Sequence, residues 1–146
     1  MDYEKTIELI DANRDKVDFG AFGDGVAATW IAKGQQRLGV QFPPSFVWWL
    51  TNYGGGEING DEIFSIYERD FDEVVGGDIV YMNELYRSKG FATKGQLLIQ
   101  KNDFGEVYFL ALNERDTEEE CPIYVAPEHT KYADNFLQFL EKKINE

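Results

Sequence analysis

The sequence predicts a single α+β domain spanning residues 1–146, in which an antiparallel or mixed sheet packs against several helices. Two observations lead to this fold. Apolar residues recur at helical spacing through the first half of the chain and again near its end. Short runs of β-forming residues, bounded by turn signals, fill much of the second half. The resulting order of three helices, two strands, a helix, three strands and a helix is typical of an α+β domain.

The most detailed prediction concerns a helix over residues 43–53. Pro43 and Pro44 lack a backbone N–H and have a φ angle that suits the first turn of a helix. One face of this helix carries an aromatic stripe, formed by Phe46, Trp49, Leu50 and Tyr53. Glycines 54–56 end the helix, since glycine readily adopts the positive φ of a helix C-terminus. The stripe is expected to be buried, with Trp48 at its edge and available to a partner.

Four other helices follow from the same periodicity. Asp24 is expected to cap the second of them, and Gly39 to end it. Gly76 and Gly77 weaken the start of the third, which favours a later start at Asp78. The predicted ranges are residues 3–14, 24–38, 72–88 and 133–144.

The remaining ordered segments are predicted strands. Residues 58–67 contain the turn signal Asn59-Gly60 and indicate two short strands with a tight connection. Residues 97–101 and 106–112 are apolar on both faces, which is typical of a hairpin at the centre of a sheet. Residues 123–125 are expected to be the last strand. Segments 18–23 and 114–120 are interpreted as loops.

The chain has a formal net charge of −13, with 14 basic and 27 acidic residues. Affinity for nucleic acids depends on clustered Lys and Arg, so direct nucleic-acid binding is not expected. The N-terminal residues lack the pattern of a signal peptide, and no apolar run is long enough to span a membrane. Cys121 is the only cysteine, which suits a reducing compartment. We therefore expect a cytoplasmic protein, and the sequence leaves its oligomeric state open.

Negative charge is concentrated in two segments. The first acidic segment, residues 57–78, and the second acidic segment, residues 103–128, each hold eight acidic residues and one arginine. These segments are either solvated surface or a surface that meets a basic protein. In the second case, partner contact is expected from acidic residues together with aromatic anchors. The candidate contact residues are Glu57, Asp61, Glu62, Tyr67, Glu68, Asp70, Phe71, Asp72, Glu118, Glu119, Glu120 and Trp48.

Motifs for catalysis and for metal or cofactor binding do not stand out. The glycine run at 54–60 lacks the Lys-Ser/Thr of a phosphate-binding loop. Residues 11–22 begin like a calcium loop but have Lys16 and Phe22 at positions that need Gly and Glu. Cys121 with the single histidine, His129, is interpreted as a packed cysteine and a surface histidine. We therefore predict no enzyme activity, no metal and no cofactor.

Several segments, in order along the chain, resemble the motifs of one protein superfamily. Residues 38–55, from Leu38-Gly39-Val40 to Gly54-Gly55, are similar to its first motif, although Phe42 replaces a Leu and Tyr53 interrupts an Asn-Gly-Gly. Residues 97–112 resemble its central strands, residues 133–140 its C-terminal helix, with Asn135 in place of a Ser, and residues 123–125 the strand before that helix. The similarity covers residues 24–144 and is to the SUKH superfamily, which includes fungal glucan-synthesis regulators and bacterial toxin-immunity proteins. It implies an α+β domain that binds another protein and has no catalytic residues.

Three functions follow from these observations. The first is an immunity protein that covers the active site of a cognate toxin, whose domain is expected to be basic and nuclease-like. The alternative is a regulatory or scaffold module of the glucan-synthesis-regulator type. The third, a hydrolase with paired carboxylates, requires a deep pocket that holds a carboxylate of raised pKa.

Overall fold

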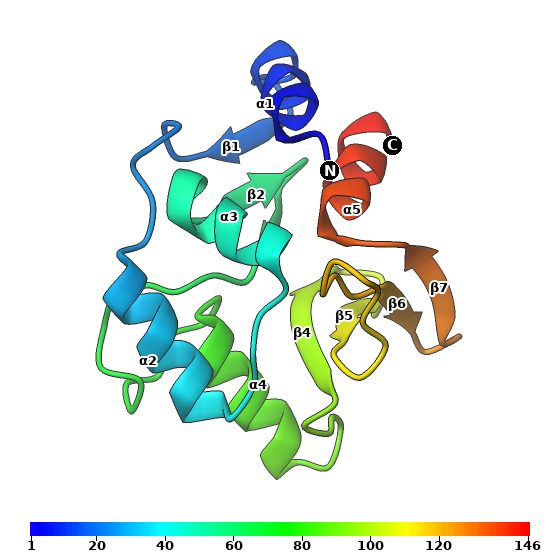
Figure 1. Ribbon diagram of the computed structural model, residues 1–146. Coiled ribbons are helices and arrows are strands. Elements are labelled where there is room, and N and C mark those ends of the chain that lie inside the picture. The colour runs from blue at the N-terminus through cyan, green and yellow to red at the C-terminus, as the bar shows by residue number, and fades with distance from the viewer.

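The computed structural model describes residues 1–146 and contains five helices and one seven-stranded sheet (Figure 1). The helices are α1 (Tyr3–Ala12), α2 (Ala28–Leu38), α3 (Pro44–Tyr53), α4 (Ile79–Ser88) and α5 (Phe136–Asn145). The strands are β1 (Val17–Phe19), β2 (Gly56–Ile58), β3 (Asp61–Ile63), β4 (Gln96–Lys101), β5 (Val107–Ala111), β6 (Ile123–Ala126) and β7 (Thr130–Ala133). None of the five helices is long and apolar enough to cross a membrane.

The seven strands lie in the sheet in the same order as in the sequence, and every neighbouring pair is antiparallel. The antiparallel form of the predicted sheet is therefore confirmed. The predicted β4–β5 hairpin lies at the centre of this sheet, with Leu97 opposite Leu110 and Leu98 opposite Phe109. The turn between β2 and β3 is also confirmed, since Asn59 and Gly60 both have positive φ angles, of 51° and 87°.

Helix α3 is confirmed almost to the residue. Pro43 is its N-cap, and Gly54, with a φ of 78°, donates its N–H to the Leu50 carbonyl at 3.1 Å. The aromatic stripe is buried as expected, because Phe46 and Trp49 are 0% exposed. Its rings continue into α5, where the Phe136 ring lies 5.0 Å from that of Phe46. The stripe thus forms the middle of a core of 34 buried apolar residues.

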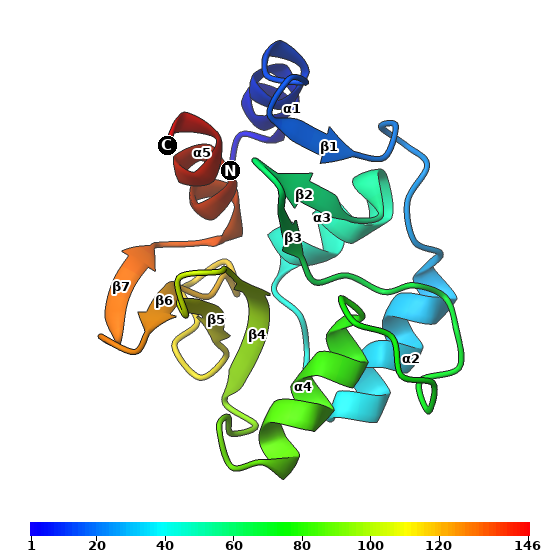
Figure 2. The same ribbon diagram turned by 180° about the vertical axis from the view of Figure 1, so that it is seen from behind.

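Four of the five helices form two groups around the sheet, and α3 contacts one helix of each group (Figures 1 and 2). Helices α1 and α5 pack side by side near the two termini, and α2 packs against α4 at the other end of the molecule. Helix α5 covers one face of the central strands, where the Phe139 ring meets that of Tyr108 at 5.6 Å. Helix α4 lies toward the other face, because its Tyr86 lines a pocket with Leu98 and Phe109, and Asn83 bonds the backbone N–H and C=O of Leu98 at 2.8 and 3.0 Å. The two groups therefore lie on opposite faces of the central hairpin.

Two strands were not predicted. Residues 18–23 were expected to be a loop, but β1 includes Asp18 and Phe19 and pairs with β2. Residues 123–125 were expected to be the last strand, but β7 follows, so Ala133 ends a strand and α5 starts at Phe136. Both strands are three or four residues long and lie at the edges of the sheet. Such short strands depend on their neighbours, and their own sequence carries little β signal.

The predicted starts of α2 and α4 were also wrong. Asp24 does not cap α2, because the N-cap is Ala27 and makes no side-chain capping bond. Helix α4 does not begin at Asp72. It begins at Ile79, and Asp78 is its N-cap, as the two glycines had favoured. Residues 64–78, which join β3 to α4, therefore form a long connection over α2.

Candidate functional site

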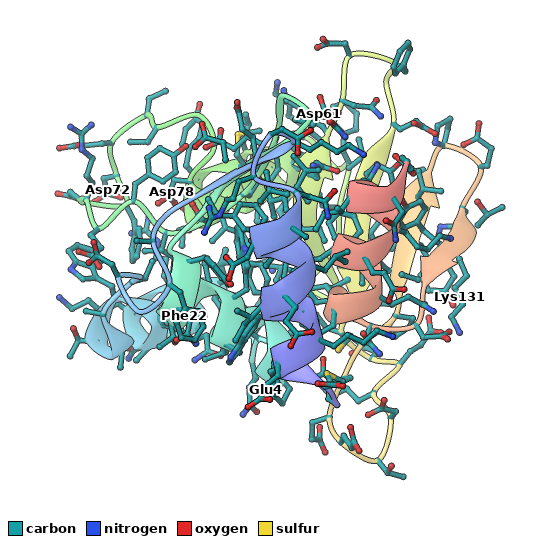
Figure 3. All side chains as sticks on the ribbon, turned by 90° about the horizontal axis from the view of Figure 1, so that it is seen from above. Glu4, Phe22, Asp61, Asp72, Asp78 and Lys131 are labelled. Atoms are coloured by element: carbon teal, nitrogen blue, oxygen red, sulfur yellow. The ribbon has the colours of Figure 1, made fainter.

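The sequence-predicted contact residues fall into three groups in the structure. Ten of the twelve are exposed or half-buried: eight lie on the first acidic segment and two, Glu118 and Glu119, on the 114–120 loop. Trp48 lies beside α1, and Glu120 is buried. The 114–120 loop lies on a different side of the molecule from the first acidic segment, whereas Asp103 of the second acidic segment lines a pocket together with Asp61 and Glu62. In Figure 3 Asp72 lies at one edge, whereas the 114–120 loop, drawn in pale yellow, lies on another side near Glu4. The structure therefore does not join all twelve residues into one continuous patch.

Glu120 is the clearest departure from the expected solvated loop, since it is 2% exposed. Its carboxylate accepts hydrogen bonds from the backbone N–H and the hydroxyl of Ser45, at 2.9 and 2.6 Å. Pro43 and Pro44 have no N–H, so Ser45 carries the first backbone donor of α3. Glu120 thus caps α3 from a distant loop, and a carboxylate suits the positive end of a helix. It is not available to a partner.

Hydrogen bonds within the 114–120 loop hold the Glu120 carboxylate in position for this contact. Asp116 Oδ1 accepts the N–H groups of Glu118 and Glu120 at 2.8 and 3.0 Å, and Asp116 N donates to the Glu120 carbonyl at 2.9 Å. Arg115 donates to the carbonyls of Glu119 and Gln41. Consequently Glu118 and Glu119 project from a fixed loop, and both are exposed.

Burial raises the pKa of Glu120, and the two bonds from Ser45 lower it without cancelling the effect of burial. Repulsion from Asp116 and Glu118 adds to the rise. Glu120 is the one carboxyl group whose pKa is clearly raised, but its oxygens are occupied by Ser45. The hydrolase hypothesis required such a group in an accessible pocket, so we do not carry it forward.

Carboxylates of the first acidic segment also hold helix starts. Asp78 Oδ1 accepts from Val80 and Tyr81 at the start of α4, at 2.9 and 3.2 Å, and its Oδ2 accepts from the N–H of Tyr67 at 3.1 Å. Glu68 Oε1 accepts from the N–H of Ala27, the N-cap of α2, at 2.9 Å. Two more acids of this segment therefore serve the fold, although Glu68 remains exposed.

The 66–74 part of this segment also presents a mixed acidic and aromatic surface. Phe71 packs edge-on against Trp30 of α2 at 5.6 Å, and Asp72 pairs with Arg37 at 2.8 Å. Tyr67 is 37% exposed and donates its hydroxyl to Glu62. Burial, followed by the bond to Glu62, raises the pKa of Tyr67. Asp70 and Asp72 are exposed next to these rings.

The other predicted contact residues are less accessible to a partner. Glu57, Asp61 and Glu62 are half-buried on β2 and β3. Trp48 is also half-buried, because its ring contacts those of Tyr3 and Tyr53 at 4.6 and 5.9 Å. A tryptophan at the edge of the buried face was expected, and Trp48 lies there. The exposed part of its ring borders α1.

Cys121 is fully buried, and burial raises its thiol pKa to about 11. His129 is exposed and stacks on Tyr124 at 5.2 Å. The interpretation of the pair as a packed cysteine and a surface histidine is therefore confirmed. No three His, Cys, Asp or Glu side chains are arranged to hold a metal ion.

Ser45 and Arg37 position these acids, and neither residue was predicted from the sequence. For Ser45 a signal existed: after two prolines, its N–H is the first in the helix that needs an acceptor. For Arg37 none existed, because its partners Asp72 and Glu84 are brought to it only by the fold.

The chain matches a known protein family. The family model SUKH_6, described as "SMI1-KNR4 cell-wall", matches residues 28–140 of the chain. The matched range runs from the start of α2 into α5 and includes the central strands and both acidic segments.

Proposed function

Because the chain belongs to the SUKH family, we propose that it is an immunity protein that binds a cognate bacterial toxin and covers the toxin's active site. Proteins of this family often bind other proteins and are generally non-catalytic. In the proposal the toxin domain is basic and of the nuclease type, and the chain acts in the cytoplasm without catalysing a reaction. Binding to a basic nuclease needs an acidic surface in place of the nucleic-acid backbone.

One observation carries this proposal: exposed carboxylates surround aromatic side chains on the first acidic segment. Asp70 and Asp72 flank Phe71, whose ring rests on Trp30, and Tyr67 lies three residues before Asp70. Aromatic residues within a charged rim are typical of binding hot spots. The carboxylates would raise the association rate with a basic partner, and the rings would supply contact energy.

The 114–120 loop offers a second acidic contact through Glu118 and Glu119. Both are exposed on a loop that Asp116 and Arg115 hold in place. A fixed loop loses little conformational freedom on binding, which favours affinity. Because this loop and the first acidic segment lie on different sides, a toxin that touches both must wrap around the edge of the molecule.

The test uses the protein encoded next to this chain. The neighbouring product is expressed with and without the chain, and cell survival, co-purification and affinity are measured. We expect the neighbour to be toxic alone, harmless with the chain, and bound with an affinity that falls as salt rises. A neighbour that is not toxic and does not bind would contradict the proposal.

A second candidate function is a regulatory or scaffold module of the glucan-synthesis-regulator type. The words "cell-wall" in the description of the matching family model favour it. It predicts that the chain binds a cellular protein without abolishing any toxicity. The survival measurement above separates the two functions, because only an immunity protein rescues cells from the neighbouring product.

A further inference from the structure

We infer that the open face of the central sheet carries a docking pocket for one apolar side chain of a basic peptide segment in a partner protein. The pocket has a volume of about 290 Å³ and lies between the end of α4, the β4–β5 hairpin and the β6–β7 turn. Its apolar lining comes from Tyr86, Phe91, Leu98, Val107, Phe109 and Ala126. None of the twelve candidate toxin-contact residues lines it.

This face is open because no helix covers it beyond β4. Leu98, Phe109 and Tyr124 lie opposite one another on three adjacent strands, so they share one face of the sheet. Helix α5 lies on the other face, and α4 reaches only β4 (Figures 1 and 2). Leu98 and Phe109 at the bottom of the pocket are buried, and the pocket opens to solvent between the exposed residues Phe91 and His129.

The size and the lining decide what fits. Sites for drug-sized molecules have volumes of roughly 300–1,000 Å³. A volume of about 290 Å³ lies at the lower limit and suits one leucine or aromatic side chain. Phe91, which lines the entrance, is 71% exposed although its ring lies 6.1 Å from that of Tyr86. A large ring left in water at the mouth of an apolar pocket indicates a contact surface.

The opposite wall of the pocket is a rigid aromatic stack. The His129 ring lies 5.2 Å from Tyr124 at an interplanar angle of 16°, and 5.6 Å from Phe109. His129 has a φ of 59°, in the left-handed region, where histidine occurs more often than most residues other than glycine. The wall is thus preorganised for an incoming side chain.

The charges around the pocket favour a basic segment. Glu128 is exposed on the β6–β7 turn between the lining residues Pro127 and His129, and it makes no ion pair or side-chain hydrogen bond. Nearby cations point elsewhere: Arg87 donates to the Leu38 carbonyl, Lys94 Nζ lies against Gly39, and Lys131 pairs with Asp134 at 2.7 Å. A lysine or arginine next to the anchor would meet the free carboxylate of Glu128. A second copy of this chain, with its net charge of −13, would be repelled.

The test is a titration of the ¹⁵N-labelled full chain with the blocked peptide Lys-Lys-Phe-Lys-Lys, followed by amide NMR shifts. Two control peptides replace the anchor or the charges: Lys-Lys-Ala-Lys-Lys and Glu-Glu-Phe-Glu-Glu. We expect the first peptide to shift amides of β4–β6 and of the 127–129 turn and to bind at least tenfold more tightly than either control. Equal binding of the Phe and Ala peptides, or shifts confined to residues 57–78 and 114–120, would overturn the inference.

A matched pair of variants tests whether the apolar side chain of the peptide binds beside Phe91. Phe91→Ser removes the exposed ring at the entrance, and Phe104→Ser removes a ring that is 89% exposed on the hairpin turn but does not line the pocket. Their amide spectra show directly whether each variant is folded. We expect Phe91→Ser to weaken peptide binding at least tenfold and Phe104→Ser to change it less than twofold. Equal effects of the two substitutions would contradict the assignment of the pocket.

A second matched pair tests the charges. Glu128→Lys should weaken binding of the Phe peptide about threefold at low salt and by less at high salt, because the contact is screened. Glu141→Lys makes the same charge change at an exposed position of α5 and should have a smaller effect. If both substitutions weakened binding equally, the net charge of the chain alone would explain the preference for a basic peptide. That part of the inference would then be overturned. These measurements need no toxin, so their outcome is independent of the proposed immunity function.

Discussion

The first acidic segment and the 114–120 loop are both rich in acidic residues, but their carboxylates have different roles in the fold. In the first segment the engaged acids are spread out: Asp78 caps α4, Glu68 bonds the N-cap of α2, and Asp72 pairs with Arg37. In the loop a single buried acid, Glu120, caps α3, while its neighbours Glu118 and Glu119 are exposed. The loop therefore separates the structural role from the surface role between adjacent residues.

This difference shows why a count of acids overstates an interaction surface. Helix N-termini carry backbone N–H groups without partners, and acidic side chains from distant loops can satisfy them. Three of the five helices in this chain obtain an acceptor from an acid in one of the two segments. The remaining exposed carboxylates form the smaller set that a partner can meet.

The largest effect is expected from the core to which both segments are attached. Phe46→Ala removes a ring that is 0% exposed and contacts Phe42, Trp49 and Phe136. It should lower the unfolding free energy by about 3–5 kcal/mol, as for other fully buried aromatic residues. Phe104→Ala, at a site that is 89% exposed, is the matched control. Urea unfolding measures both, and similar losses would show that α3 is not the core helix.

The next effect sharpens the contrast within the first acidic segment. Asp78→Ala leaves the N–H groups of Val80, Tyr81 and Tyr67 without their acceptor and should cost about 1–3 kcal/mol of unfolding free energy. Asp72→Ala removes an exposed pair with Arg37 and should cost about 0–1 kcal/mol. If thermal and urea unfolding gave the two variants the same stability, the division into structural and surface acids would fail in this segment.

A pH effect is expected from Glu120. Its pKa in the folded chain is raised above the ordinary value of 4.5, so the folded state binds its proton more tightly than the unfolded state. The contribution of Glu120 to stability should therefore fall as pH rises from 4.5 through its folded pKa, and then stay level. Urea unfolding of the wild type and of Glu120→Gln across this range measures the difference. A difference that does not change with pH would contradict the raised pKa.

The smallest effect on stability is expected from the exposed pair. Reversing Glu118 and Glu119 to Lys should change the unfolding free energy by about 0.5 kcal/mol or less, because both side chains face water. The same double variant should slow association with a basic partner and flatten its salt dependence, since surface charges act over a screening length of about 8 Å. Stopped-flow association at two salt concentrations tests this. An unchanged association rate would show that Glu118 and Glu119 are solvated surface residues without a role in association.

Much of the fold could be predicted from residues whose meaning is local. Helix α3 was placed correctly because Pro43, Pro44 and the glycines after Tyr53 act through their own backbone angles. The central hairpin was clear because its two apolar runs are long and flank a turn. The start of α4 was correct only in its later alternative, at Asp78, since the weak helix formers Gly76 and Gly77 precede it.

The errors all concern structure that depends on distant partners. Strand β1 exists because β2 pairs with it and Arg14 donates to the Phe19 carbonyl at 3.1 Å. Asp24 was a reasonable cap by type, but the acceptor at the start of α2 comes from Glu68, 41 residues from Ala27. Likewise nothing near Glu120 in the sequence indicates burial, because its partner Ser45 is 75 residues away. Local patterns cannot show which acids the fold will use.

The most direct test of this division compares two neighbouring residues of the 114–120 loop. The unfolding free energy is measured for Glu120→Ala and for Glu119→Ala under the same conditions at neutral pH. Glu120→Ala leaves the N–H and hydroxyl of Ser45 without an acceptor and should cost about 2–3 kcal/mol. Glu119→Ala, whose side chain is 71% exposed, should cost about 0.5 kcal/mol or less. Equal costs for the two variants would contradict the account.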